Sequence, residues 1–84
     1  MNRAMASHEG AGSLKTGDAV SITCNGRAVP GSILFASSNG KSLMLEFEAI
    51  IEGHVGMMPV LLGDDGRYAS IVTGIAVDLK RESP

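Results

Sequence analysis

Acidic and histidine side chains are the groups in this chain best suited to chemistry. Glu46 and Glu48 are two residues apart, so both side chains point to the same face of an extended strand. Such a pair is suited to ligating a metal ion or to transferring protons. Glu52 and His54 flank Gly53, and neither pair has a third ligand at a recognisable spacing. We therefore interpret both pairs as solvated surface groups, and we predict no catalytic residue, no metal ligand and no cofactor.

The single cysteine, Cys24, lies in an alternating apolar stretch. One cysteine cannot form an intramolecular disulfide, and a free cysteine packs as a small hydrophobic residue. A nucleophilic cysteine requires a nearby base or cation, and no local signature supplies one. The chain also lacks an apolar run of the roughly 18 residues that cross a membrane. We therefore expect a reduced, packed thiol in a cytoplasmic protein that does not bind membranes.

The balance of charge disfavours binding to nucleic acid. Seven lysines and arginines are outnumbered by nine aspartates and glutamates, for a net charge of −2, and the cations are scattered. Nucleic-acid sites usually combine a basic patch with aromatic side chains that stack on bases. Phe35 and Phe47 occupy core positions of their predicted strands, which leaves Tyr68 as the aromatic expected to be accessible. Tyr68 and the adjacent Arg67 are our candidates for ligand contact; a cross-strand pair on the outer surface is the alternative.

Glycine turns and alternating residues define the elements that position these groups. Asn25-Gly26, Asn39-Gly40 and Asp65-Gly66 are flanked by alternating apolar residues, which favours type I′ hairpin turns, and Thr73-Gly74 is a weaker turn signal. Between the turns the hydrophobic period is two, which is typical of half-buried antiparallel strands. The pattern predicts strands over residues 18–24, 27–37, 41–49, 56–62, 67–72 and 75–79, with a connection over 50–55.

Consecutive hairpins without crossover helices predict an all-β fold. A meander this small covers its apolar face by curling into a barrel or by dimerising. We predict a small, bent antiparallel meander that forms a barrel of five to six strands over residues 14–80, with a tail over 81–84. Pro30 and Gly31 predict a bend, bulge or edge within the second strand. The predicted core consists of Val20, Ile22, Val29, Ile33, Phe35, Leu43, Leu45, Phe47, Val60, Ile71, Ile75, Val77 and Leu79.

Residues 1–13 are small and polar without apolar periodicity, and we expect them to form a disordered leader that the fold does not require. A chain that begins at Leu14 should therefore melt within a few degrees of the full chain when the two are compared by calorimetry. A loss of about 4–8 °C, which corresponds to roughly 1 kcal/mol in a domain of this size, is the result that contradicts this prediction.

The segment Gly17–Ile22, followed by Gly26 and by Gly31-Ser32-Ile33, resembles the opening of SH3-like small barrels of the KOW type. The resemblance implies an SH3-like barrel. KOW domains commonly bind RNA or ribosomal and transcription proteins and are usually basic, whereas this segment has few cations. Residues 41–62 also look like those of small uncharacterised bacterial proteins, a likeness that implies no function. The type II dihydrofolate reductases are similar in length and barrel class, but their Val-Gln-Ile-Tyr motif is absent.

Surplus apolar residues on the outside of the sheet predict self-association. Antiparallel strands with one wet face alternate cleanly, but residues 57–62 are apolar on both faces. We predict a homodimer or larger assembly; capping of the barrel ends is the alternative use of these residues. The predicted function is a non-catalytic barrel for protein interaction or assembly, the alternatives being a KOW-type nucleic-acid-binding barrel and a very small oligomeric enzyme with an inter-subunit site. The interface candidates are Leu34, Met44, Met57, Leu61 and Val72.

Overall fold

The computed structural model describes residues 14–82. The predicted leader over residues 1–13 and the end of the predicted tail lie outside this range. Within it no helix is long and apolar enough to cross a membrane. The elements are strands, each within about two residues of its predicted bounds: β1 (Ala19–Cys24), β2 (Arg27–Ala36), β3 (Ser42–Ile51), β4 (His54–Leu62), β5 (Tyr68–Ser70) and β6 (Ala76–Arg81).

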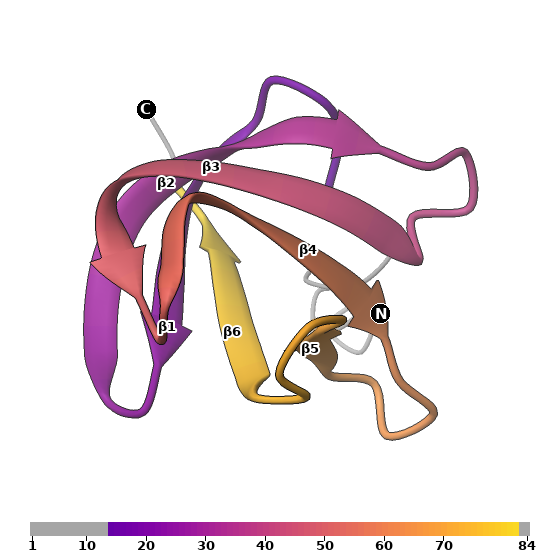
Figure 1. The fold of residues 1–84 in the computed structure, drawn as a ribbon. Coiled ribbons are helices and arrows are strands. Elements are labelled where there is room, and N and C mark those ends of the chain that lie inside the picture. The colour runs from indigo at the N-terminus through magenta and orange to yellow at the C-terminus, as the bar shows by residue number, and fades with distance from the viewer. Residues whose placement is uncertain (1–13, 83–84) are drawn as a thin grey trace, which may run out of the picture.

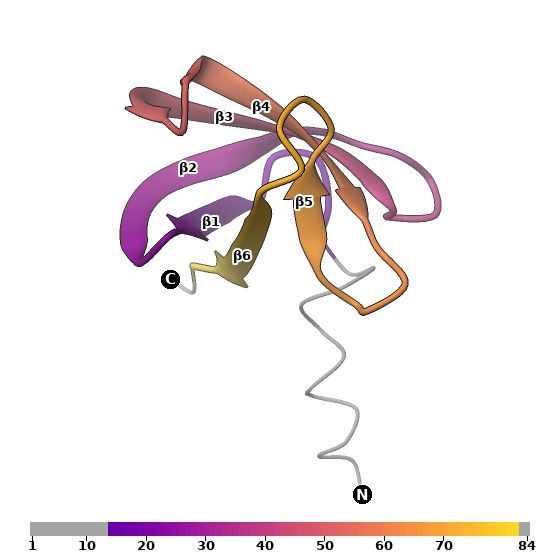
Figure 2. The same ribbon diagram turned by 60° about the horizontal axis from the view of Figure 1, so that its bottom comes forward.

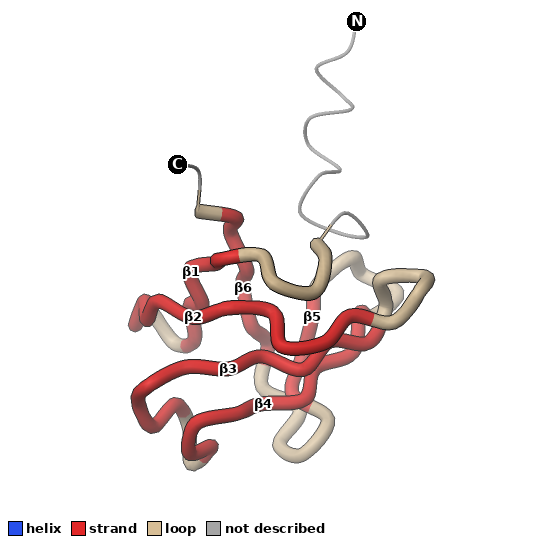
Figure 3. Tube along the Cα trace, turned by 90° about the horizontal axis from the view of Figure 1, so that it is seen from above, coloured by secondary structure: helices blue, strands red, loops and turns tan. Residues whose placement is uncertain are grey.

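The six strands close into an antiparallel barrel in chain order, which confirms the predicted all-β meander. Each strand pairs with the next one along the chain, and β1 pairs with β6 to complete the circle. The long strands β2, β3 and β4 arch over one side, while β1, β6 and the short β5 close the other (Figures 1 and 3). β2 bends as predicted near Gly31, since its first half pairs with β1 and its second half pairs with β3.

Asn25 and Gly26 form the predicted two-residue turn between β1 and β2. Their φ angles of 49° and 81° are the left-handed values that a type I′ turn needs at both positions. A Cβ atom added at Gly26 would meet no atom within 4 Å. A side chain at this position is therefore unfavourable because of the positive φ angle and not because of a steric clash with other residues.

Replacing Gly26 with valine should lower the free energy of unfolding by about 1 kcal/mol or more, because β-branched residues resist positive φ. Gly26→Asn is the matched control, since asparagine tolerates this conformation, and it should cost less. Urea denaturation measures both variants, and equal stability of the wild type and Gly26→Val is inconsistent with the turn assignment.

The remaining turns differ in part from the prediction. Glu52 and Gly53, inside the predicted connection over 50–55, form a tight turn with φ of 47° and 84° that joins β3 directly to β4. Non-glycine residues rarely adopt such angles, and a Glu-Gly pair is a weaker hairpin signal than Asn-Gly. The turns at Asn39 and Asp65 lie where predicted but are longer, and each side-chain Oδ1 accepts the main-chain N–H two residues further on at 3.0 Å.

The core fills the single interior of the barrel and matches the prediction at most positions. Ile75 and Leu79 are only partly buried. The prediction missed Leu14, Ile51, Met58 and Tyr68 as core residues. The predicted residues that are buried are Val20, Ile22, Val29, Ile33, Leu43, Leu45, Phe47, Val60 and Val77.

Phe35 and Ile71 were predicted in the core, and both predictions were wrong. Their exposed fractions are 58% and 57%. A β-bulge between Ile33 and Phe35 adds one residue to β2, and this shifts Phe35 from the inner to the outer face. Tyr68 and Ser70 are the inward-facing residues of β5, so the alternation points Ile71, one residue past the end of the strand, outward.

Asp18 ties the start of the barrel to its last strand. Its Oδ2 accepts the main-chain N–H of Lys15 at 2.9 Å and an N–H of the Arg81 guanidinium at 3.2 Å. The main-chain hydrogen bond from Lys15, followed by the charge of Arg81, holds the pKa of Asp18 below its ordinary value of 3.8.

The lowered pKa predicts an acid-sensitive contribution to stability. Because the folded-state pKa lies below the unfolded one, the contribution is complete above about pH 3.8 and is lost as the pH falls through the folded value. The urea midpoint of Asp18→Asn should therefore depend less on pH than that of the wild type over about pH 5 to 2. Parallel curves for the two proteins are the contrary result.

Candidate interaction surface

A row of apolar side chains crosses the outer face of four neighbouring chain segments. Phe35 on β2 pairs with Met44 on β3, and Met44 pairs with Pro59 on β4. The row continues at Ile71, whose main-chain N–H donates to the carbonyl oxygen of Pro59 at 2.9 Å. Directly paired residues have Cβ atoms about 5 Å apart, so these four side chains form a continuous surface.

Further apolar side chains flank this row. Leu34 precedes Phe35 at the bulge, Met57 and Leu61 lie two residues either side of Pro59 on the same face of β4, and Val72 follows Ile71. Except for Met44 and Pro59, which are half-buried, all the residues of this surface are exposed. None carries a charge. We refer to this surface as the apolar stripe: Leu34, Phe35, Met44, Met57, Pro59, Leu61, Ile71 and Val72.

Of the five interface candidates from the sequence, Met44, Met57 and Leu61 lie on the outer face of β3 and β4, and Leu34 and Val72 are exposed next to members of the central row. Sequence reasoning missed Phe35, Pro59 and Ile71, which supply three of the four members of the central row. Alternation assigned Phe35 and Ile71 to the core because neither the bulge in β2 nor the phase of β5, in which Ser70 faces inward, has a clear sequence signal. Pro59 could have been found, since it shares a strand face with Met57 and Leu61.

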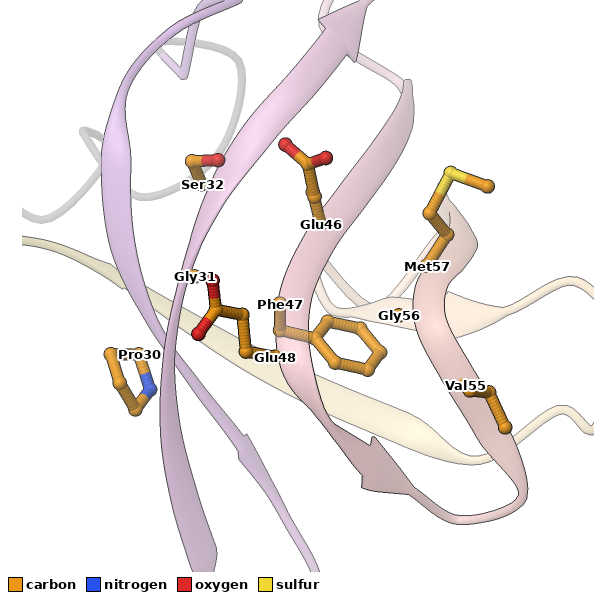
Figure 4. Close-up of a pocket in the computed structure, with 9 residues that line it drawn as sticks. All are labelled: Pro30, Gly31, Ser32, Glu46, Phe47, Glu48, Val55, Gly56 and Met57. Carbon is orange, nitrogen blue, oxygen red and sulfur yellow. The ribbon is translucent and has the colours of Figure 1, made fainter.

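A groove of about 730 Å³ opens beside Met57, where β2, β3 and β4 diverge. Its cause is an irregularity in β3: the register with β4 passes from Glu46–Met57 to Ile50–Val55, so three residues of β3 oppose Gly56 alone. Gly56 adopts a φ of 79° at this irregularity, and the register between β2 and β3 ends beside it at Gly31–Phe47. Figure 4 shows the side chains that line the groove: Pro30, Ser32, Glu46, Phe47, Glu48, Val55 and Met57.

Glu46 and Glu48, whose spacing predicts a shared strand face, both line this groove. Both are exposed, and neither carboxylate has a hydrogen bond or ion pair with another residue in the range 14–82. No third ligand joins them: over the described part of the chain there is no group of three histidine, cysteine, aspartate or glutamate side chains that could hold a metal ion.

The prediction that His54 is a solvated loop residue was wrong. His54 is the first residue of β4 and is buried, and both ring nitrogens are hydrogen-bonded, Nδ1 with the carbonyl oxygen of Ile51 and Nε2 with the hydroxyl of Ser70. Glu52 points elsewhere: its Oε2 accepts a hydrogen bond from the Asn25 side chain at 2.9 Å, which joins the two hairpin turns at this end of the barrel. The Glu52–His54 spacing therefore does not produce a joint site.

Tyr68 is not an accessible aromatic, contrary to the prediction. Its exposed fraction is 3%, and its hydroxyl donates to the carbonyl oxygen of Gly40 at 2.6 Å, which ties β5 to the β2–β3 turn. The neighbouring Arg67 points outward and forms an exposed ion pair with Asp78 on β6 at 3.1 Å. The two ligand-contact candidates therefore lie on opposite faces of the barrel wall and do not form one site.

Cys24 is buried at the end of β1, as its alternating position predicts. Burial raises the pKa of its thiol, and the negative charges of Glu52 and Asp78 raise it further. A thiol in such surroundings is protonated at neutral pH and is a poor nucleophile. Cys24 thus belongs to the packing of the barrel rather than to a reactive site.

Comparison of the chain with protein-family models, with curated proteins and with solved structures finds no match. The likeness of residues 17–33 to KOW-type barrels, and that of residues 41–62 to small bacterial proteins, therefore rest on those residues alone. The geometry of the apolar stripe is the evidence on which a function can be argued.

Proposed function

We propose that this protein is a non-catalytic assembly module, an SH3-like barrel that forms a homodimer through the apolar stripe. The observation that carries the proposal is the unbroken row from Phe35 through Met44 and Pro59 to Ile71. A single bulky apolar side chain on a surface is ordinary, but a contiguous patch of several hundred Å² marks an interaction site in soluble proteins.

The size of the barrel adds to this argument. A chain of 84 residues has one small interior, and it buries only about 60% of the surface that its unfolded form exposes. Covering the apolar stripe adds a second buried layer to that thin core. A stable interface buries about 800 Å² on each partner, with an apolar centre and a polar rim. The stripe supplies such a centre, and Ser32, Ser42 and Glu46 provide polar groups at its margin.

The absence of charge from the stripe favours a second copy of the chain as the occupant. In a dimer with twofold symmetry the same patch meets itself, so any charge near its centre faces its own like charge. The eight residues of the stripe avoid this repulsion. The two methionines, Met44 and Met57, add adaptable side chains that adjust to the partner surface.

Methionine methyl resonances provide a direct test. Met44 and Met57 lie in the stripe, whereas Met58 is fully buried in the barrel and serves as an internal control. Over about a hundredfold dilution, the methyl signals of Met44 and Met57 should move together along one binding curve while that of Met58 stays in place. Dilution curves that are flat for all three methyl groups, with a monomer mass throughout, contradict the proposal.

A further inference from the structure

The interior of the barrel holds a pair of polar side chains, one of which, Ser70, immediately precedes Ile71 of the stripe. His54 and Ser70 are both buried, and His54 Nε2 lies 2.9 Å from Ser70 Oγ. The other ring nitrogen, Nδ1, lies 2.9 Å from the carbonyl oxygen of Ile51. The pair therefore connects the end of β3 with the end of β5 through the inside of the barrel.

Counting the donors and acceptors around Ser70 Oγ and the two ring nitrogens of His54 locates the hydroxyl proton and the ring proton. Ser70 Oγ accepts the main-chain N–H groups of Val72 and Thr73, each at 3.1 Å, and these occupy its acceptor capacity. The Ser70 hydroxyl must therefore donate its own proton to His54 Nε2. The proton on the ring is then on Nδ1, where it is donated to the carbonyl of Ile51. One serine oxygen thus takes part in three hydrogen bonds.

These bonds fix the turn between β5 and β6, which Figure 2 shows beside β4. Besides its side-chain contacts, Ser70 accepts the N–H of Gly74 at its carbonyl and donates its own N–H to Ile75, both at 2.9 Å. The turn carries Ile71 and Val72, the end of the apolar stripe. Its packing is otherwise sparse, since residues 71–74 are all exposed.

We propose that Ser70 and His54 are positioning residues for the interaction surface: the pair inside the barrel holds Ile71 and Val72 in the plane of the stripe. The inference rests on the proposed self-association through the stripe. It assigns a role to His54 beyond filling space, because the imidazole orients the hydroxyl so that both oxygen lone pairs face the turn. A turn without this anchor must be ordered at the moment of binding, which weakens affinity.

Ser70→Ala is the test, with Val77→Ala as the matched control. Ser70→Ala removes the acceptor of two turn N–H groups, whereas Val77→Ala makes a cavity in the core on β6 without touching them. We expect Ser70→Ala to raise the dimer dissociation constant about tenfold and to speed amide exchange at Val72 and Thr73 by a similar factor. Val77→Ala should lower the melting temperature but change both quantities less than twofold.

A second variant keeps the test decisive if Ser70→Ala folds poorly. His54→Leu retains an apolar body of similar size but removes the acceptor that orients the Ser70 hydroxyl, so the same two quantities should rise by about threefold. If Ser70→Ala or His54→Leu changes the dissociation constant and the amide exchange no more than Val77→Ala does, the role of the pair is purely structural. That result would overturn the inference.

The outcomes also separate this inference from the proposed function. If the wild type remains a monomer, self-association is wrong, and the positioning role is judged from amide exchange alone. Exchange at Val72 and Thr73 that is faster in Ser70→Ala than in Val77→Ala then supports the anchor. Exchange that is equal in the two variants overturns it, whatever the mass of the protein.

Discussion

Replacing Gly31 with alanine should lower the free energy of unfolding by about 3 kcal/mol or more. This is the largest loss of stability that we expect from adding one methyl group anywhere in the described part of the chain. A Cβ atom at this position would lie 2.5 Å from the carbonyl oxygen of Glu46 and 2.6 Å from Cδ1 of Ile22. One of these atoms belongs to the paired main chain of β3 and the other to a fully buried side chain, so neither can move cheaply. Urea denaturation measures the change.

Gly66→Ala is the matched control for this prediction. Gly66 lies in a turn with a φ of 84°, and a Cβ there would meet nothing within 4 Å. Its substitution should cost only about 1 kcal/mol, from backbone conformation alone. Losses of the same size in the two variants would show that the close approach of β2 to β3 and Ile22 does not limit stability.

Met44→Lys should abolish self-association, the largest expected effect on assembly. Met44 is the centre of the row, paired with Phe35 on one side and Pro59 on the other, so a lysine there would be buried in the proposed dimer against uncharged surfaces. An unpaired buried charge costs several kcal/mol, which raises the dissociation constant by more than about a hundredfold. Sedimentation velocity at fixed concentration should show the monomer alone, with thermal melting confirming that the variant is folded.

Val55→Lys controls for the added charge. Val55 has an exposed fraction of 74%, yet it lies at the β3–β4 hairpin beside the groove and outside the stripe. This variant should retain the dissociation constant of the wild type within about threefold, since rim charges contribute little to affinity. Leu34→Lys, at the margin of the stripe, should fall between the two. Folded Met44→Lys and Leu34→Lys proteins with unchanged mass are incompatible with a role for the stripe.

The strands could be predicted from the sequence because local chemistry determines them. Asn25-Gly26 supplies the positive φ angles that a tight turn requires, and the alternation over Val20, Ile22 and Cys24 matches the pleat of a strand with one buried face. Over residues 14–82, where the structure contains strands and turns but no helix, successive hairpins leave few arrangements besides a meander. For this reason the fold class and the strand bounds followed from turns and alternation.

The outer surface depends on irregularities that local patterns do not reveal. The extra residue near Leu34 reverses the direction of Phe35, and the inward phase of β5 at Ser70 leaves Ile71 outward. Two residues assigned to the core are therefore the ends of the apolar row. Long-range hydrogen bonds explain the opposite error, in which residues predicted to be exposed are buried. The barrel buries Tyr68 because Gly40 accepts its hydroxyl proton, and it buries His54 because Ser70 satisfies its second ring nitrogen.

The mass of the wild-type protein in solution is the most direct test of self-association through the apolar stripe. Light scattering coupled to size exclusion, carried out at several loading concentrations up to tens of micromolar, reports that mass without any variant or label. The structure leads us to expect twice the chain mass of 8.7 kDa, falling toward the monomer value only on dilution. A mass of 8.7 kDa at every concentration would contradict the account.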